Sequence, residues 1–395
     1  MRVLHIVEAT IAGVRTHVQT LAAGLGQYGI DSTVACPLLR QNSYGDAQFV
    51  TYLANAGIPV LPVAMQRSID PRADVAALRQ LVAILRHKPF DVIHLHSSKA
   101  GFLGRFAARA SGSSAAVVYT PHGLAFLGAG GARRGLYLAL ERLAGRMCDR
   151  IVAVSAGERA LALAAGLADP GRIVCIPNGI QPPALPGVYD RPAMRRALGQ
   201  ATGAPLIGTA ARLAPQKNPR LFLEAAARLL AQLPEARFVW CGGGELEAQA
   251  RAYARQLSID HACNFTGHRD DAAQIIAALD VFWLTSDYEA LPQAPLEAMA
   301  LGVPIVATDV VGTRDLLRSG AGLLAPRHAE PFAAATLRLA QMPRRRALLA
   351  RAGQRYYAEH GTSERMLGAM ARLYESVAAP RPHSHAAPEP AALSV

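Results

Sequence analysis

The chain has 395 residues and a mass of 41.8 kDa, which is too long for one ordinary hydrophobic core and suits two domains of roughly 150–200 residues each. Half of its residues are hydrophobic (51%) and 18% are charged, and this balance excludes disordered, collagen-like and coiled-coil chains. The formal charge is +12, from 41 basic and 29 acidic residues, and only three of the basic residues are lysine: Lys88, Lys99 and Lys217. Such a basic excess predicts an anionic partner, which can be nucleic acid, a membrane surface or a phosphorylated substrate.

Short β-rich runs alternate with helical patterns through the first half of the chain. Strands are expected at residues 3–7, 32–36, 58–63, 92–95, 115–120, 151–154 and 173–176. Helical patterns are expected at residues 15–27, 74–87, 101–109, 134–147 and 157–165. Uniformly apolar strands separated by helices indicate a parallel sheet that is covered on both faces.

A proline-rich connector precedes a second half of the same kind. Residues 177–205 contain six prolines, and strands are then expected at residues 206–210, 238–241, 264–266, 281–284, 304–308 and 323–324. We therefore predict an α/β protein with two doubly wound, Rossmann-like domains facing each other across a cleft. The first spans residues 1–180, the linker 181–204, the second 205–362, and a disordered tail 379–395. Ligands of such sheets bind at the carboxyl ends of the strands, so the site is expected in the cleft.

The cysteines and the apolar runs bear on the compartment. The five cysteines are scattered and form no C-x-x-C motif, which favours a reducing cytosol over a disulfide or zinc framework. The first ten residues do not resemble a signal peptide, and no stretch reaches the about 18 uncharged apolar residues of a membrane-spanning helix. We expect a cytoplasmic protein that is at most peripheral on the inner face of the membrane. Nucleic acid is not expected as a partner, because no aromatic-and-basic module is present.

Two strand-to-helix turns predict a phosphate site. Gly13 follows the first strand, where it allows a phosphate to approach the helix N-terminus or simply makes a tight turn. Arg212 and Lys217 precede Asn218 and Pro219, which suit the N-cap and first position of a helix. Cations there are unfavourable unless an anion binds, so a diphosphate is favoured over two solvated surface cations.

Two glutamates and a glycine turn lie in the second half. Glu289 follows the expected strand 281–284. A helix is expected to start at Pro295, which places Glu297 in its first turn, where a carboxylate interacts favourably with the helix dipole. Carboxylates at this edge can accept hydrogen bonds from sugar or ribose hydroxyls. The turn 242–244 either lines the same crevice or is only a flexible helix entry.

This glutamate segment resembles the signature of the retaining, nucleotide-sugar-dependent glycosyltransferases of family 4, which have the two-domain GT-B fold. Seven residues separate Glu289 from Glu297, and Leu296-Glu297-Ala298-Met299-Ala300 leads into Gly302 and the run 304–308. Weaker motifs of the family follow the same order at residues 13–18, 91–101, 120–123, 177–180 and 211–218. The resemblance therefore covers nearly the whole chain.

The resemblance implies roles for the residues on the donor side. Glu297 would hold the donor ribose and Glu289 would contact the donor sugar, and the neighbouring Ala290 and Leu291 are expected to bind the donor as well. Arg212 and Lys217 would neutralise the leaving diphosphate, Gly13 would approach its phosphates, and the loop of Arg269 would meet the base. The sequence departs from the family at Ala290 and Val311, where glycine is frequent, and these departures bear on donor preference.

On the acceptor side, the resemblance places His122 beside the transferring sugar as a catalytic residue. His96, Ser97 and Lys99 are expected to contact the acceptor. The final helix, about residues 363–378, would cross back to complete the first domain. Retention implies front-face attack, with the leaving phosphate as base.

We expect no metal or other cofactor. Arg212 and Lys217 can stabilise the leaving group, and no D-x-D motif lies in a strand-end loop. His94 and His96 share one face of a strand, but the sequence shows no third ligand beside them.

The basic set Arg133, Arg134, Arg142 and Arg146 lies on or before one helix of the first half. It is either an ordinary solvated face or a contact with anionic lipid. We predict a retaining glycosyltransferase that uses a UDP-sugar, in preference to a GDP-sugar, and a hydroxyl of a lipid-linked oligosaccharide in polysaccharide assembly. The alternative is a sugar-nucleotide epimerase of the GT-B fold.

Overall fold

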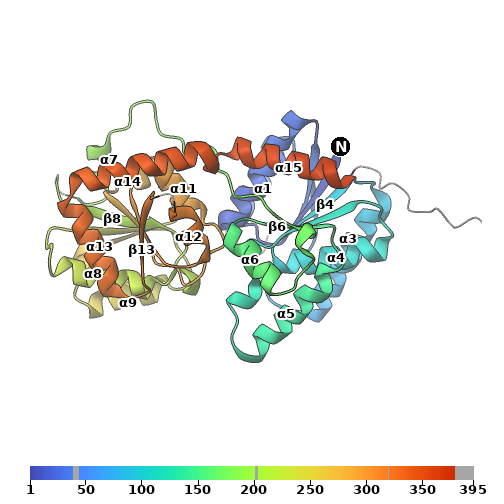
Figure 1. Cartoon of the computed structure of the whole chain (residues 1–395), viewed down its shortest axis with the longest axis horizontal. Helices are drawn as coiled ribbons and strands as arrows, with labels where there is room; N and C mark the ends of the chain where they lie inside the picture. The colour runs from blue at the N-terminus through green and yellow to red at the C-terminus, as the bar shows by residue number, and fades with distance from the viewer. Residues whose placement is uncertain (39–43, 201–202, 319, 379–395) are drawn as a thin grey trace, which may run out of the picture.

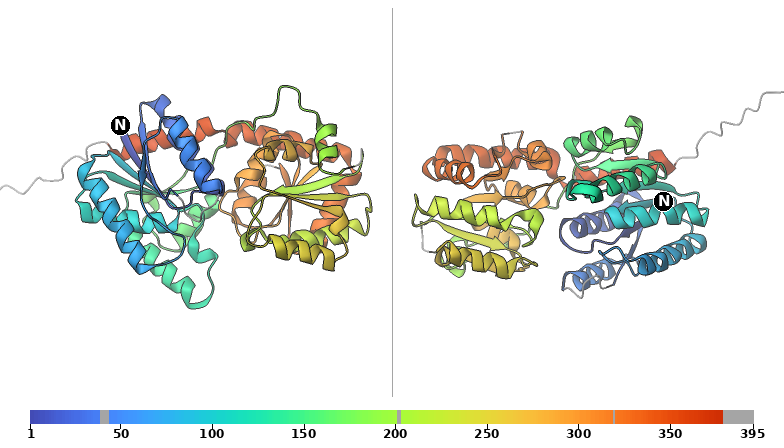
Figure 2. Two further views of the ribbon diagram at one scale, coloured as in Figure 1. Left: turned by 180° about the vertical axis from the view of Figure 1, so that it is seen from behind. Right: turned by 90° about the horizontal axis from the view of Figure 1, so that it is seen from below.

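The computed structural model describes residues 1–38, 44–200, 203–318 and 320–378. Figure 1 shows two lobes side by side, each built on one parallel sheet with helices on both of its sides (Figure 2). The seven-stranded sheet has the order β3-β2-β1-β4-β5-β6-β7, and the six-stranded sheet has the order β10-β9-β8-β11-β12-β13. The predicted fold of two doubly wound α/β domains is confirmed. The predicted tail 379–395 lies outside the described residues.

The first lobe contains seven strands and six main helices in alternation. Its strands are β1 (Arg2–Val7), β2 (Asp31–Cys36), β3 (Val60–Pro62), β4 (Val92–His96), β5 (Ala116–Thr120), β6 (Arg150–Ala153) and β7 (Ile173–Cys175). Its helices are α1 (Ala12–Gly24), α2 (Tyr44–Asn55), α3 (Pro71–His87), α4 (Ser98–Ser111), α5 (Gly131–Gly145) and α6 (Ala156–Ala164).

The second lobe repeats the alternation. Its strands are β8 (Leu206–Ala210), β9 (Arg237–Cys241), β10 (Cys263–Gly267), β11 (Val281–Leu284), β12 (Ile305–Thr308) and β13 (Gly322–Ala325). Its helices are α7 (Arg191–Ala197), α8 (Pro219–Leu230), α9 (Glu247–Gln256), α10 (Ala272–Ala278), α11 (Gln293–Ala300), α12 (Val311–Leu317), α13 (Ala329–Gln341) and α14 (Pro343–Tyr356). A π-turn over Tyr357–Gly361 leads into α15 (Ser363–Ala378).

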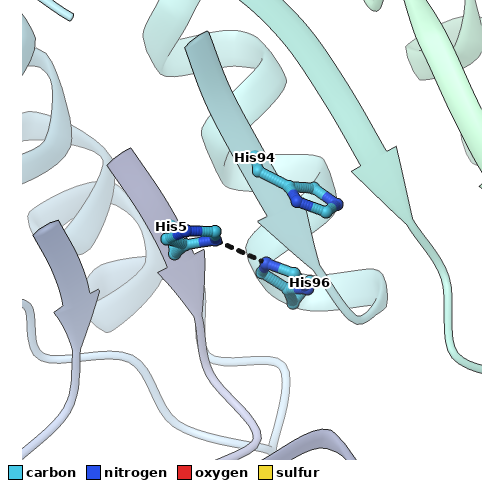
Figure 3. A group of neighbouring side chains, drawn as sticks. All are labelled: His5, His94 and His96. Carbon is cyan, nitrogen blue, oxygen red and sulfur yellow. Dashed lines mark hydrogen bonds between the residues drawn. The ribbon is translucent and has the colours of Figure 1, made fainter. Parts of the chain in front are cut away.

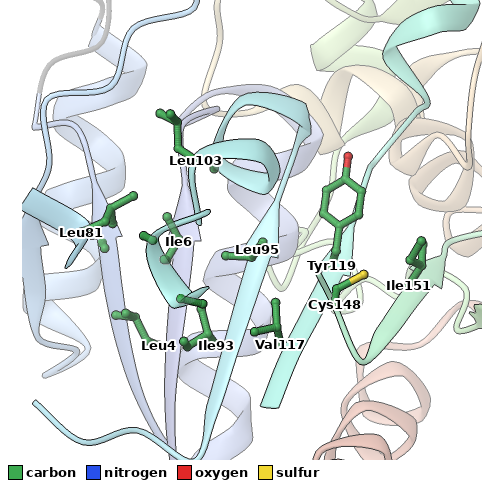
Figure 4. Close-up of a cluster of buried hydrophobic side chains, with 14 of the residues drawn as sticks. Leu4, Ile6, Leu81, Ile93, Leu95, Leu103, Val117, Tyr119, Cys148 and Ile151 are labelled. Atoms are coloured by element: carbon green, nitrogen blue, oxygen red, sulfur yellow. The ribbon is translucent and has the colours of Figure 1, made fainter. Parts of the chain in front are cut away.

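Successive side chains along each strand of the first sheet point to opposite faces of the sheet. Ile6 and Leu95 point to one face, where Leu81 of α3 and Leu103 of α4 cover them (Figure 4). The residues of opposite parity form a second core with α15, the last helix of the chain. Its members include Val3, Val92, Val118, Met366, Met370 and Tyr374. The final helix, which was expected to complete the first domain, thus packs against the first lobe and ties the two lobes together.

Helices α2 and α7 are among those that were not predicted. The sequence of α2 is rich in β-branched and aromatic residues, but Phe49 and Leu53, four residues apart, are both buried against the first lobe. In the expected linker, Asp190 caps α7 by accepting a hydrogen bond from the Ala193 N–H. Arg191 and Arg195 of α7 each lie 2.9 Å from an oxygen of Asp280, which fixes this helix to the second lobe.

None of the helices within the described residues is long and apolar enough to span a membrane. The strand order places two switch points at β1/β4 and β8/β11, where neighbouring strands are connected in opposite directions. Doubly wound sheets bind ligands outside the carboxyl ends of the strands at such points.

Candidate active site

The predicted residues follow the strands that flank the two switch points. Gly13 comes after β1 and Ser97 after β4, while Lys217 comes after β8 and Glu289 after β11. We call the opposed strand-end connections of the two lobes the interlobe site. The Asn178 amide donates a 2.9 Å hydrogen bond to the Leu291 carbonyl across it.

Backbone strain gathers at the same connections. Among the described residues, five non-glycine residues have a positive φ, and four of them lie just after a strand that ends at the interlobe site: Ala12 (56°), Ser97 (70°), His122 (55°) and Asn218 (48°). Such conformations are uncommon for residues with a Cβ and persist where the surrounding structure enforces them. No sequence pattern distinguishes these positions from ordinary turns.

Lys217 and Glu289 form the charged centre of the second lobe. Lys217 Nζ lies 2.5 Å from Glu289 Oε1, which also accepts a 2.6 Å hydrogen bond from the Ser286 hydroxyl. The side chains are 19% and 6% exposed, so water screens this pair only weakly. The sequence predicted an uncompensated cation here, whereas the structure gives Lys217 a carboxylate partner from the neighbouring connection. Arg212 lies in the same β8–α8 connection, partly buried.

The helix that carries Glu297 begins two residues earlier than predicted. Helix α11 starts at Gln293, because Pro295 fits its first turn without breaking it, and Glu297 falls in the second turn. The helix dipole therefore gives this carboxylate less support than expected. Burial raises its pKa to about 7, and its side chain has no hydrogen-bond or ion-pair partner within the described residues. Glu297 is a carboxylate with unused acceptor capacity.

Close backbone packing surrounds Glu289 and Ala290. A Cβ built on Gly312 would lie 2.3 Å from the Ala290 carbonyl oxygen, so a residue with a side chain would force this loop apart. Gly312 also donates a 3.1 Å hydrogen bond to the Glu289 carbonyl. Val311 points to the other lobe, where its Cγ1 fills the space beside Gly157. The valine at 311 thus serves a contact between the lobes.

The N-terminus of α1 in the first lobe faces the start of α11 in the second lobe. Its N-cap is Ile11, which offers no side-chain hydrogen bond, and its first turn contains no acidic residue. A Cβ on Gly13 would meet only the Gln293 side chain, at 3.8 Å. The uncapped N–H groups and the positive end of the 13-residue helix suit an anion between the lobes.

The β9 and β10 connections form the rim of the site in the second lobe. Arg269, predicted to meet the base, makes a two-pronged ion pair with Asp271 at 2.6 and 2.7 Å. The glycine turn before α9 packs on backbone: a Cβ on Gly244 would lie 2.3 Å from the Leu213 carbonyl oxygen. This close contact with the backbone explains the glycine at position 244 without a role in ligand binding.

A pocket of about 610 Å³ lies between α1 and α2. All of its lining residues except Ala47 carry a polar group: Arg15, Gln19, Ala47, Gln48, Thr51, Tyr52 and Asn55. Gln48 accepts a 3.1 Å hydrogen bond from Arg15 and donates one of 3.3 Å to Asp270 of the second lobe.

Five histidines, His5, His17, His94, His96 and His122, form what we call the histidine cluster of the first lobe. His5 and His94 are register partners on β1 and β4, and His96 follows on the same face (Figure 3). The sequence showed no third ligand near His94 and His96, but the neighbouring strand supplies His5. Both His94 nitrogens are bonded, one to the Tyr374 hydroxyl at 2.5 Å and one to the Thr120 hydroxyl at 2.7 Å, which leaves no lone pair for an ion.

His122 stands where the cluster reaches the interlobe site. Its Nε2 lies 3.2 Å from His96 Nδ1, and the His17 ring packs edge-on against it at 4.5 Å between centroids. Burial lowers the pKa of His122 well below its ordinary value. The turn is held by Glu158, whose buried carboxylate accepts 2.8 Å hydrogen bonds from the Gly123 and Val154 N–H groups. Burial raises the pKa of Glu158 to about 7 despite these two bonds.

The predicted acceptor contacts fall into different surroundings. His96 is fully buried, so the structure gives it no surface for an acceptor. The Ser97 hydroxyl is buried without a partner in the described part of the chain. Lys99 is occupied by Asp74, 2.6 Å away, and by the Ser68 carbonyl.

Sequence reasoning missed His5, His17 and Glu158. One signal was available. His5 lies two residues after Val3 on the same strand, and pairing of Val3 with Val92 on a parallel strand brings His5 beside His94. The roles of His17 and Glu158 depend on helix packing that no local pattern reveals.

Two family models match the chain: Glycosyl transferase 4-like domain over residues 12–179 and Glycosyl transferases group 1 over residues 190–356. The UDP-Gal:alpha-D-GlcNAc-diphosphoundecaprenol alpha-1,3-galactosyltransferase of Escherichia coli is 32% identical over 260 residues, which is 64% of this chain and 66% of that protein. A D-inositol 3-phosphate glycosyltransferase of Geodermatophilus obscurus is 32% identical over 326 residues, 75% of this chain and 70% of that protein.

Among solved structures, HepE of Anabaena in complex with UDP-glucose is similar in fold. Its TM-score is 0.80 at 21% identity, with 95% of this chain and 100% of that chain covered. Because both family models describe glycosyl transferases, the alternative of a sugar-nucleotide epimerase is not favoured.

Proposed function

The chain belongs to the group 1 glycosyl transferases and is a glycosyltransferase, and we propose that its donor is a UDP-sugar. We propose that the sugar moves to a hydroxyl of a lipid-linked oligosaccharide in polysaccharide assembly, with retention of configuration. Two observations carry the donor side: the uncapped N-terminus of α1, which meets the start of α11 at Gln293, and the cations Arg212 and Lys217 in the β8–α8 connection of the second lobe. Both place positive potential where a diphosphate develops charge as it leaves.

The remaining donor roles follow from this placement. Glu297, mostly buried and without a partner in the described residues, accepts hydrogen bonds from the ribose hydroxyls. Glu289 orients the donor sugar, and Lys217 turns from Glu289 toward the diphosphate as its charge grows. The acceptor hydroxyl attacks from the face that the phosphate leaves, and the phosphate oxygen takes its proton. Since these cations serve the leaving group, we propose that no metal is required.

The relatives support the choice of donor and acceptor. The name of the Escherichia coli relative includes UDP-Gal and a diphosphoundecaprenol carrier, and HepE was solved with UDP-glucose.

A thermal-shift comparison of UDP, UDP-sugars and GDP-sugars tests the donor. Binding at 100 times Kd stabilises a protein by about 2.7 kcal/mol, so UDP-sugars should raise Tm by several degrees and GDP-sugars by less. Lys217→Ala should lose most of the shift. Lys88→Ala is the matched control, because Lys88 is exposed at the end of α3 that leads into the amino end of β4. An equal shift with GDP-sugars would contradict the UDP preference.

Helix α5 is the surface that we propose meets the membrane. Leu136 and Leu143, two turns apart on it, are 55% and 51% exposed, and Arg133, Arg134, Arg142 and Arg146 are exposed around them. Exposed leucines among arginines suit the interface of an anionic bilayer, where each basic residue contributes about 1 kcal/mol.

Flotation with anionic and neutral vesicles tests this surface. The protein should float with anionic vesicles only, and a Leu136→Ser, Arg142→Ser variant should float less. Substitution of Arg345 and Leu348 on α14, a similar exposed pair in the second lobe, is the matched control. Equal binding to both kinds of vesicle would contradict the proposal.

A further inference from the structure

Three imidazoles form a single file from the interior of the first sheet to the interlobe site. The Ser32 hydroxyl lies 3.4 Å from His5 Nε2, and His5 Nδ1 lies 3.2 Å from His96 Nε2 (Figure 3). His96 Nδ1 in turn lies 3.2 Å from His122 Nε2. Neighbouring rings are nearly parallel, at interplanar angles of 29° and 21°. Every nitrogen of His5 and His96 is therefore bonded within the file.

The rings of this file are neutral at physiological pH. Burial lowers the pKa of His5 to about 3 and those of His96 and His122 well below the ordinary range. The titratable rings packed against them, His17 and His94, are also buried and lower these values further. A neutral imidazole has one donor and one acceptor nitrogen. The file can therefore run in only two ways, with every N–H pointing toward the interlobe site or every N–H pointing away from it.

Ser32 decides between the two directions. Its side chain is buried, and within the described residues its hydroxyl has His5 as its partner. If His5 donated to Ser32, the hydroxyl hydrogen would be left without an acceptor, and a buried unsatisfied donor is costly. Ser32 therefore donates to His5 Nε2. His5 then donates from Nδ1 to His96, and His96 donates from Nδ1 to His122 Nε2.

We propose that His5 and His96 are positioning residues that hold His122 as its Nδ1–H tautomer, so that a neutral N–H donor faces the substrate in the interlobe site. His122 is partly exposed, and within the described part of the molecule its hydrogen bond is made through Nε2, which leaves Nδ1 without a partner. A free imidazole in water prefers the Nε2–H form, so the file imposes the less common one. A neutral donor can hydrogen-bond a sugar or phosphate oxygen without placing another cation beside Lys217. The significance for transfer rests on the proposed function, whereas the tautomer itself does not.

Nitrogen NMR of protein labelled with ¹⁵N-histidine measures the tautomer directly and requires no substrate. His122→Asn assigns the signals of His122 by their disappearance. In the wild type, His122 should carry its proton on Nδ1. In His96→Leu, which removes the donor to Nε2, the proton should move to Nε2. In His96→Asn, an amide N–H replaces the imidazole N–H, and the Nδ1–H form should return.

His17→Phe is the matched control for the tautomer. His17 is buried against the same rings, but neither of its nitrogens has a hydrogen-bond partner within the described residues. Phenylalanine keeps the ring contact, so the His122 signals should stay in the Nδ1–H pattern. A shift in this variant as large as that in His96→Leu would mean that packing alone sets the tautomer, which overturns the proposal.

Kinetics separates positioning from general loss of structure. His96→Leu should lower kcat for transfer by about tenfold, the size expected for one misdirected hydrogen bond, with little change in KM for the UDP-sugar. His96→Asn should recover most of kcat. If His96→Leu does not fold, the wild-type spectrum still decides, since an Nε2–H His122 there overturns the proposal. Absence of transfer by the wild type, with the Nδ1–H tautomer present, would instead contradict the proposed function.

Discussion

The two sides of the interlobe site differ in the charge of the side chains that they present. The second lobe presents an ion pair, with Lys217 and Glu289 held 2.5 Å apart at the ends of β8 and β11. On the first lobe, the groups that we place nearest the substrate carry no formal charge: the uncapped end of α1 and the histidine cluster, whose pKa values burial lowers. The charged side can therefore stabilise a charged leaving group, while the neutral side can orient oxygen atoms without competing for that charge. The following experiments test this contrast, from the largest expected effect to the smallest.

Removal of the charged centre should have the largest effect. Lys217→Ala should lower kcat/KM by roughly 10²–10³, the loss typical for one group that stabilises a developing charge. Glu289→Gln should cause a comparable loss, because it leaves Lys217 without its anionic partner and weakens the sugar contact. Steady-state transfer assays measure both, with Lys88→Ala as the control. Near-wild-type rates in both variants would remove the second lobe from the chemistry.

Acid should destabilise the first lobe before the second. The buried histidines have folded pKa values below the unfolded value of 6.5, so the unfolded state binds more protons and stability falls as pH drops below 6.5. Glu158 and Glu297, with folded pKa values of about 7, act in the opposite direction between pH 4.5 and 7. In the first lobe, the five histidines outnumber the single opposing group, Glu158, so acidification lowers the stability of that lobe. In the second lobe, protonation of Glu297 raises the stability as the pH falls.

The two tryptophans separate these transitions experimentally. Trp240 and Trp283 both lie in the second sheet, so tryptophan fluorescence follows that lobe while circular dichroism follows both. In guanidinium unfolding at pH 5, the dichroism should change at a lower denaturant concentration than the fluorescence. His17→Phe should flatten the pH dependence by up to about 1.4 kcal/mol per pH unit. Coincident transitions at pH 5 and pH 7 would refute the contrast in stability.

The turn that carries His122 should be sensitive to Glu158. Glu158→Gln keeps the shape but turns an N–H donor toward the Gly123 or Val154 N–H, leaving one buried donor unsatisfied. The expected loss is about 2 kcal/mol in the free energy of unfolding, together with a lower kcat and an unchanged Tm response to UDP. If the UDP response fell as well, the lobes would not divide the donor and sugar functions as proposed.

The smallest expected effect concerns the strained turn of the second lobe. Asn218 has φ 48° and caps α8 by accepting a 3.0 Å hydrogen bond from the Leu221 N–H. Asn218→Ala should lower the free energy of unfolding by about 1–2 kcal/mol, through loss of the cap and the cost of a positive φ for alanine. Asn218→Gly should lower it by only a few tenths of a kcal/mol. Chemical denaturation followed by tryptophan fluorescence measures both, and a larger loss for glycine would show that strain is unimportant there.

Much of the fold was predictable because its signals are local. Every expected strand is present, with bounds within about two residues, since apolar runs bounded by polar turns determine them. The Asn218 cap and Pro219 start of α8 were also correct. The predicted start of α11 at Pro295 was wrong, because proline is tolerated throughout the first turn and does not identify the first residue. Helix α7 was missed because prolines around it suggested an irregular connector.

The sequence by itself determined the two doubly wound domains, the loop with Arg212 and Lys217, and the pair Glu289 and Glu297, because each depends on residues close together in the chain. Only the tertiary structure decided which groups are paired. Lys217 meets Glu289 from a connection 72 residues away, and His5 meets His96 from a strand 91 residues away. Burial then determines whether these groups are charged, because the pKa depends on the surroundings that folding brings together. The lone lysine among arginines was visible in the sequence, whereas its partner and the neutral histidines opposite it were not.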